Sequence, residues 1–130
     1  MRYLIAVLAL AGLLVSCFAL REHFRTEPSP CSINERWDCG VVNHSPFAEI
    51  AGVPVAVFGI LGYAAIAGFS LARRWWIVLL LTTGAVGFSI YLTYIEARVL
   101  ETYCIWCVTS AGIVALTEIA AIVAVVRRRR

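Results

Sequence analysis

The sequence predicts an all-α integral membrane protein, a four-helix bundle with a long extracytoplasmic loop between its first and second spans. The chain has 130 residues, of which 62% are hydrophobic, and its mean hydropathy of +0.86 is far above that of a soluble domain. Four apolar runs approach the roughly 20 residues that a helix needs to cross a bilayer: 3–20, 53–72, 75–95 and 104–126. The length fits one domain covering residues 1–130.

The first span, residues 3–20, is the shortest of the four. Within it, Leu14-Val15-Ser16-Cys17 resembles a bacterial lipoprotein cleavage motif. Arg2 alone precedes the apolar run, which is little positive charge for a signal peptide. We therefore expect a retained span in which Cys17 is a small, buried apolar residue.

The outer loop 21–52 is the only long hydrophilic segment, and it contains Cys31 and Cys39. Pro28 and Pro30 predict an extended, stiff connector before the first of these cysteines. Residues 41–50 mix apolar and polar positions, as a segment lying at the membrane interface does. This loop therefore carries two thiols at the membrane surface.

Spans 53–72 and 75–95 are separated by only two residues, so they must form an antiparallel hairpin. Glycines at 59, 62 and 68 should permit close helix packing in the first of them. A second outer loop, 96–103, then leads to the last span.

Glu118 is the only formally charged residue inside any predicted span. A buried acid in a membrane is a functional candidate, but this one lies 11 positions beyond Cys107. We expect it to hydrogen-bond Thr82 or Thr83, or to lie near the cytoplasmic face.

Arginine placement predicts the topology. Seven arginines mark one side of the membrane in very short segments: Arg2, Arg73, Arg74 and Arg127 to Arg130. This pattern is typical of cytoplasmic flanks, so both termini should be cytoplasmic and loops 21–52 and 96–103 extracytoplasmic. The cysteines then face the oxidising side of a bacterial plasma membrane. The net charge of +3 is modest. We therefore attribute the arginines to membrane topology and expect no nucleic-acid partner.

The motif Cys104-Ile105-Trp106-Cys107 opens the last span. Residues at i and i+3 share one helix face, so the two thiols are neighbours. The helix N-terminus stabilises a thiolate at Cys104, while Cys107 lies about 4.5 Å deeper along the axis. The outer thiol suits disulfide exchange, and the inner one suits contact with a lipid-soluble oxidant.

The pair Cys31 and Cys39 is open to several interpretations. Alone it resembles a stabilising disulfide, but beside a membrane CxxC it resembles a shuttle that exchanges disulfides. A zinc site would require four clustered cysteines, and the spacing of the loop pair is not typical of zinc ligands; we expect no metal. A non-enzymatic membrane protein with structural disulfides or a metal site remains the alternative.

The order and spacing of these motifs resemble the bacterial vitamin K epoxide reductase family over nearly the whole chain. The resemblance rests on one set of elements: Cys31-x7-Cys39, Ser45, Gly52-Val53-Pro54-Val55, Phe58-Gly59, Tyr63 and Tyr103 to Cys107. The family implies a quinone, ubiquinone or menaquinone, as electron acceptor within a four-helix bundle.

The resemblance also implies roles for individual residues. Electrons would pass from a partner dithiol to Cys31/Cys39, then to Cys104/Cys107 and then to quinone. Cys39 would attack Cys104, Cys107 would face the quinone, and Ser45 would help to cap the site. The expected quinone contacts are Val55, Phe58, Trp106 and Ala111.

Two departures refine this expectation. Relatives that reduce vitamin K epoxide carry an Asn and a Tyr at the positions of Val55 and Ala111, and both side chains hydrogen-bond the quinone carbonyls. Their replacement here favours quinone-coupled disulfide formation over epoxide reduction. The chain also lacks the fused thioredoxin-like domain of some relatives, so its partner should be a separate thioredoxin-like dithiol oxidase. The nearest enzymatic rival is the unrelated disulfide bond formation protein B, which also couples thiols to quinone in four helices. In that protein the CxxC lies in the first outer loop and the spaced cysteine pair in the second, which is the reverse of the order here.

Overall fold

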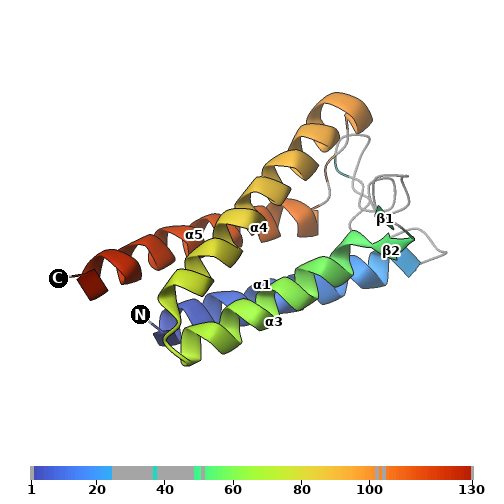
Figure 1. The fold of residues 1–130 in the computed structure, drawn as a ribbon. Coiled ribbons are helices and arrows are strands. Elements are labelled where there is room, and N and C mark those ends of the chain that lie inside the picture. The colour runs from blue at the N-terminus through green and yellow to red at the C-terminus, as the bar shows by residue number, and fades with distance from the viewer. Residues whose placement is uncertain are drawn as a thin grey trace.

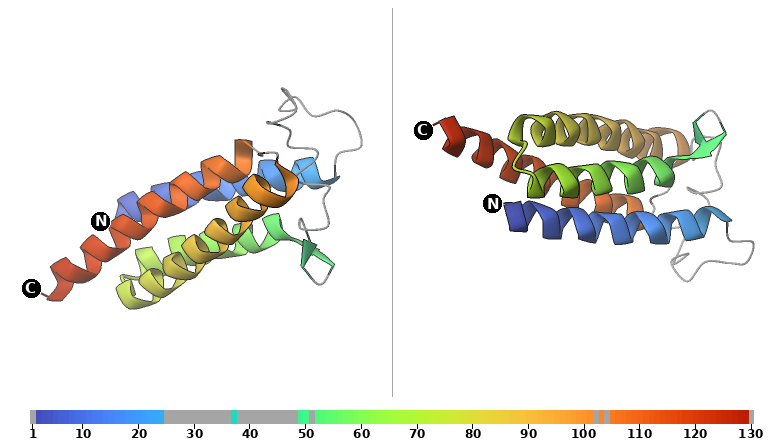
Figure 2. Two further views of the ribbon diagram at one scale, coloured as in Figure 1. Left: turned by 90° about the horizontal axis from the view of Figure 1, so that it is seen from above. Right: turned by 60° about the horizontal axis from the view of Figure 1, so that its bottom comes forward.

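The computed structural model describes residues 2–24, 37, 49–50, 52–101, 103 and 105–129. Its main elements are the helices α1 (Arg2–Phe24), α3 (Val55–Leu71), α4 (Trp75–Ile95) and α5 (Ile105–Arg129). They form an elongated bundle with both termini at one end (Figure 1), and the two further views agree (Figure 2). The predicted all-α four-helix fold is confirmed.

Three of the helices are long and apolar enough to cross a membrane: Tyr3–Arg21, Trp75–Val99 and Ile105–Arg127. Helix α3 has only 17 residues, about 25 Å at 1.5 Å per residue. It is shorter than the predicted span 53–72 because Val53–Pro54 forms strand β2, which pairs antiparallel with β1, Glu49–Ile50. Gly52 between them adopts φ +82, a conformation that glycine takes without steric strain.

The predicted hairpin of the second and third spans forms at a tight turn. The backbone N–H of Arg73 donates to the Ser70 carbonyl, and that of Arg74 donates to the Phe69 carbonyl at 2.9 Å. These bonds satisfy carbonyls that the end of a helix leaves without partners. Helix α4 then begins at Trp75, where the sequence predicts it.

Helix α4 does not end where the outer loop 96–103 was expected to begin. It continues as a π-helical segment, η2, over Glu96–Leu100. The segment closes at Glu101, which has a left-handed conformation and donates its N–H to the Glu96 carbonyl. The connection to α5 is therefore shorter than the sequence indicates, and Glu96 belongs to the bundle.

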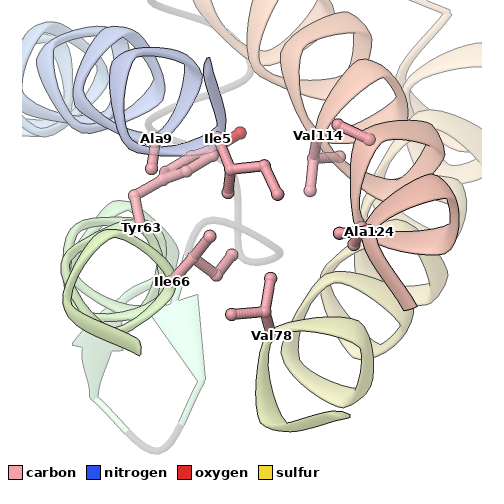
Figure 3. Close-up of a cluster of buried hydrophobic side chains, with 9 residues drawn as sticks. Ile5, Ala9, Tyr63, Ile66, Val78, Val114 and Ala124 are labelled. Carbon is pink, nitrogen blue, oxygen red and sulfur yellow. The ribbon is translucent and has the colours of Figure 1, made fainter. Parts of the chain in front are cut away.

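The core lies between the four helices, where Ile5, Tyr63, Ile66, Val78 and Val114 point toward one another (Figure 3). Large apolar side chains also cover the outer face, among them Leu10, Leu61, Leu80, Ile90 and Leu116. A helix that is apolar on all sides is typical of a membrane span. Small residues complete the core and let the helices approach closely: Ala9, Ala120, Ala121 and Ala124.

Two glycines, Gly12 and Gly59, allow α1 and α3 to pack closely. This role was predicted from the sequence for Gly59 but not for Gly12. A Cβ atom at Gly59 would lie 2.7 Å from Ser16 Oγ, and one at Gly12 would lie 2.3 Å from the Tyr63 ring. Apart from the backbone of α3 itself, no described atom lies within 4 Å of a Cβ placed at Gly62 or Gly68. The prediction of close packing is therefore wrong for these two positions.

Replacing Gly12 with alanine should destabilise the bundle. The new methyl group would overlap the Tyr63 ring, and overpacking of this kind costs about 1–3 kcal/mol. Thermal unfolding in detergent, followed by circular dichroism, would measure the change. The control is Gly68→Ala, an exposed position that should be neutral or slightly stabilised. Equal midpoints for the two variants would contradict the close α1–α3 contact.

Candidate functional site

The four helices surround a partly open cavity of about 240 Å³. Its wall is mainly apolar and includes Val55 and Phe58 of α3, Phe88 of α4 and Trp106 of α5. A buried apolar cavity of about 150 Å³ suffices to bind benzene. The cavity therefore has room for a ring-sized apolar ligand, with an exit for a longer substituent.

Cys107 lies in the wall of this cavity and is half-buried. The preceding Trp106 stacks on Phe18 of α1, with ring centroids 5.0 Å apart and planes inclined by 20°. This stack fixes the beginning of α5 against α1. The arrangement places the inner cysteine of the CxxC against an aromatic, ring-sized cavity.

Tyr63 links α3 to α5 on the same side of the cavity. Its hydroxyl donates to the Ser110 carbonyl at 2.9 Å, and its oxygen lies 2.8 Å from Ser110 Oγ. The side chain is almost fully buried. Since both hydrogen bonds reach the turn of α5 that follows Cys107, Tyr63 holds that turn in position.

Two described residues, one from each part of the sequence that carries a cysteine pair, are in contact. Trp37 and Tyr103 form an isolated parallel β-bridge, and their ring centroids are 5.3 Å apart. In the sequence, Cys39 follows Trp37 by two positions and Cys104 follows Tyr103 directly. The bridge therefore joins the long outer loop to the CxxC segment.

Several predicted site residues lie outside the described residues, namely Cys31, Cys39, Ser45 and Cys104, as does His44. Of the predicted quinone contacts, Val55, Phe58 and Trp106 line the cavity. Ala111 is half-buried and follows the cavity-lining Ser110, but it is not among the described lining residues.

Glu96 is the site residue that the sequence interpretation missed. It is the first residue of the predicted outer loop 96–103, yet its side chain is only 2% exposed and lines the cavity. Ser89 and Thr93 of α4 line the cavity as well. Spacings of four and three residues put these polar side chains on one helix face. This periodicity is the feature of the sequence that could have assigned Glu96 to the cavity wall.

Glu118 and Cys17 are not among the described residues that line the cavity. Thr82 and Thr83 donate hydrogen bonds to the Glu118 carboxylate, the latter at 2.9 Å, so the expected structural role of this acid is confirmed. Cys17 is exposed on α1, so the prediction that it is buried is wrong. Its neighbour Ser16 faces inward instead.

A sequence model described as the Vitamin K epoxide reductase family matches residues 3–122. The match includes helices α1, α3 and α4 and most of α5, together with both predicted cysteine pairs.

Proposed function

Because this chain belongs to the vitamin K epoxide reductase family, we propose that it generates disulfides by oxidising a separate thioredoxin-like protein and reducing a membrane quinone. Family membership makes it a membrane oxidoreductase that couples disulfides to quinone. The observation that carries the proposed direction and acceptor is the position of Cys107 in the wall of the aromatic cavity.

The cavity fits a quinone head group in size and in chemistry. Its volume of about 240 Å³ exceeds the space that a single aromatic ring requires. Apolar and aromatic walls with a few polar groups are typical of small-molecule sites. We propose that Val55, Phe58, Trp106 and Ala111 hold the ring on the basis of the family resemblance, although only the first three line the cavity. When bound, a quinone accepts two electrons and two protons.

The bridge between Trp37 and Tyr103 supports exchange between the two cysteine pairs. Paired strands lie about 4.8 Å apart, and consecutive Cα atoms are about 3.8 Å apart. Connectivity therefore limits the Cα atoms of Cys39 and Cys104 to a separation of at most about 16 Å. A disulfide requires roughly 5.5–6 Å between the Cα atoms, and a separation of this size lies within that limit.

In the proposed relay, a partner dithiol reduces the Cys31–Cys39 disulfide, and Cys39 then attacks Cys104. Resolution of the mixed disulfide leaves Cys104 and Cys107 reduced, and this pair delivers its electrons to the quinone. Ser45 helps to cap the site. The relay moves electrons toward the membrane one disulfide at a time.

The proposed location is a bacterial plasma membrane, with the active thiols extracytoplasmic and both termini cytoplasmic. Two features support this orientation: the termini lie at the same end of the bundle (Figure 2), and seven arginines flank that side in short segments. The partner would then meet the thiols in an oxidising compartment.

The test is anaerobic mixing of the purified protein with a reduced thioredoxin-like dithiol and a soluble quinone analogue. We expect one quinone consumed for each dithiol oxidised, with both cysteine pairs cycling between thiol and disulfide. Cysteine labelling with mass spectrometry would follow the pairs. Absence of quinone consumption with several dithiol partners, while both pairs stay oxidised, would support structural disulfides. Stoichiometric bound metal would support the metal-site alternative.

A further inference from the structure

One carboxylic acid lies in the cavity wall together with the redox-active cysteine. Glu96 begins the π-helical segment η2, is 2% exposed and borders the same cavity as Cys107. π-helical turns inside α-helices frequently occur at functional sites. A carboxyl group within a membrane span is costly to bury, so its presence at this cavity requires an explanation.

We propose that Glu96 is the proton donor to quinone, so that its carboxyl group protonates a quinone oxygen as the Cys104–Cys107 pair is oxidised. This inference rests on the proposed function and assigns a residue to its proton transfer. General acids of this kind must lie within reach of the atom that they protonate. Glu96 borders the cavity that the quinone would occupy, as Cys107 does, so the proposed ligand would lie beside the acid.

The other polar groups of the described cavity wall do not offer the same chemistry. The titratable side chains there are Glu96, Cys107 and Tyr63. Cys107 carries the electrons in the proposed relay, and the Tyr63 hydroxyl donates to the Ser110 carbonyl. The hydroxyl groups of Ser16, Ser89, Thr93 and Ser110 can donate hydrogen bonds but are too weakly acidic to release a proton. Glu96 is therefore the described acid suited to the step.

The proton and electron balance closes without another reagent. Oxidation of the Cys104–Cys107 pair breaks two S–H bonds and forms one S–S bond, and its two electrons reduce quinone to quinol. Glu96 gives one proton to a quinone oxygen and regains one from a thiol of the pair, so it ends each cycle unchanged. The second thiol proton reaches the other quinone oxygen through water.

The structure also indicates how the acid is held in position. Ser89, Thr93 and Glu96 follow one face of α4 into η2, and all three line the cavity. The Glu96 carbonyl accepts the N–H of Glu101, which ends the segment in a left-handed conformation. The backbone of Glu96 is thus held between the α-helix that precedes it and the π-helical turn that it begins.

The experiment compares Glu96→Gln, Glu96→Asp and Glu101→Gln. Glutamine keeps the shape of Glu96 but cannot release a proton, aspartate restores the acid, and Glu101 is an exposed acid directly after η2. We expect Glu96→Gln to lower kcat for quinone reduction by about 10²-fold, Glu96→Asp to recover part of it and Glu101→Gln to resemble the wild type. Quinone affinity, measured by tryptophan quenching, should change by less than roughly twofold in all three.

Two further measurements separate proton donation from a structural role. Dithiol exchange with Cys31–Cys39, measured without quinone, should be unaltered in Glu96→Gln. A time-resolved infrared difference spectrum of quinone reduction should show the transient loss and return of a carboxyl C=O band, which Glu96→Gln lacks and Glu96→Asp shifts. Equal kcat in wild type and Glu96→Gln would overturn the inference, as would parallel loss of exchange and quinone affinity. A wild type that reduces no quinone would instead refute the proposed function.

Discussion

Replacing Cys107 with serine should abolish quinone reduction. Among the described residues, Cys107 is the cysteine that borders the cavity, and serine cannot form the disulfide that releases two electrons. Loss of a nucleophile that acts as part of a unit lowers turnover by roughly 10³-fold or more. Anaerobic quinone absorbance with a reduced dithiol partner would measure the change. Cys104→Ala should have the same effect, and retained activity in that variant would contradict the proposed relay.

The control for this cysteine is Cys17→Ser. Cys17 is exposed on α1 and is not among the described residues of the cavity wall, so the variant should retain the wild-type rate.

The double variant Cys31→Ser, Cys107→Ser leaves Cys39 and Cys104 without their resolving partners. When an added small-molecule disulfide serves as the oxidant and is itself reduced to two thiols, the variant should accumulate a disulfide between Cys39 and Cys104, which peptide mapping would detect. A dominant bridge from Cys17 in that variant would contradict the proposed pairing.

The fold class could be predicted because bilayer-crossing helices require long apolar segments. Helix α4 spans Trp75–Ile95 as predicted, and the arginine pair marks the turn before it. The start of α3 could not be predicted in the same way. Val53 and Pro54 are apolar in either structure, and the choice of a strand depends on pairing with Glu49–Ile50.

The helix extension through Leu100 was missed because a charge usually marks the end of a span. Glu96 lies instead in the wall of an internal cavity, where a carboxyl group does not face hydrocarbon. Hydropathy alone cannot distinguish these two environments. The contact of Gly12 with the Tyr63 ring is also tertiary, since nothing in either local sequence specifies the partner.

The redox part of the site could be predicted better than its binding surface. The spacing of Cys104 and Cys107 at the start of a helix indicates chemistry directly. Residues that shape a cavity carry no comparable pattern, because apolar side chains suit lipid, core and ligand equally. Gly62 illustrates this point, since the sequence indicates helix packing and the structure places the residue beside open space.

The second large effect is expected when the cavity is filled by Gly62→Leu. Gly62 lines the cavity, and apart from the backbone of α3 no described atom lies within 4 Å of a Cβ placed there. A side chain can therefore begin at this position without a close contact, and we expect leucine to occupy space that the quinone ring requires. Forcing a ligand into an overpacked site costs about 1–3 kcal/mol, so kcat/KM for quinone should fall roughly 10- to 100-fold.

Gly68→Leu is the matched control, because it lies six residues further along α3, is exposed and, apart from the backbone of α3, also has no described atom within 4 Å of its Cβ position. It should keep the wild-type kcat/KM and quinone affinity. Both variants should retain wild-type thermal stability and dithiol exchange, since neither position contacts a described side chain or carries a thiol. Gly62→Ala should have an intermediate effect, because one methyl group occupies less of the cavity. Equal quinone affinity in Gly62→Leu and Gly68→Leu would place the quinone elsewhere. In that case the position of Cys107 in the cavity wall would no longer support electron transfer at this site.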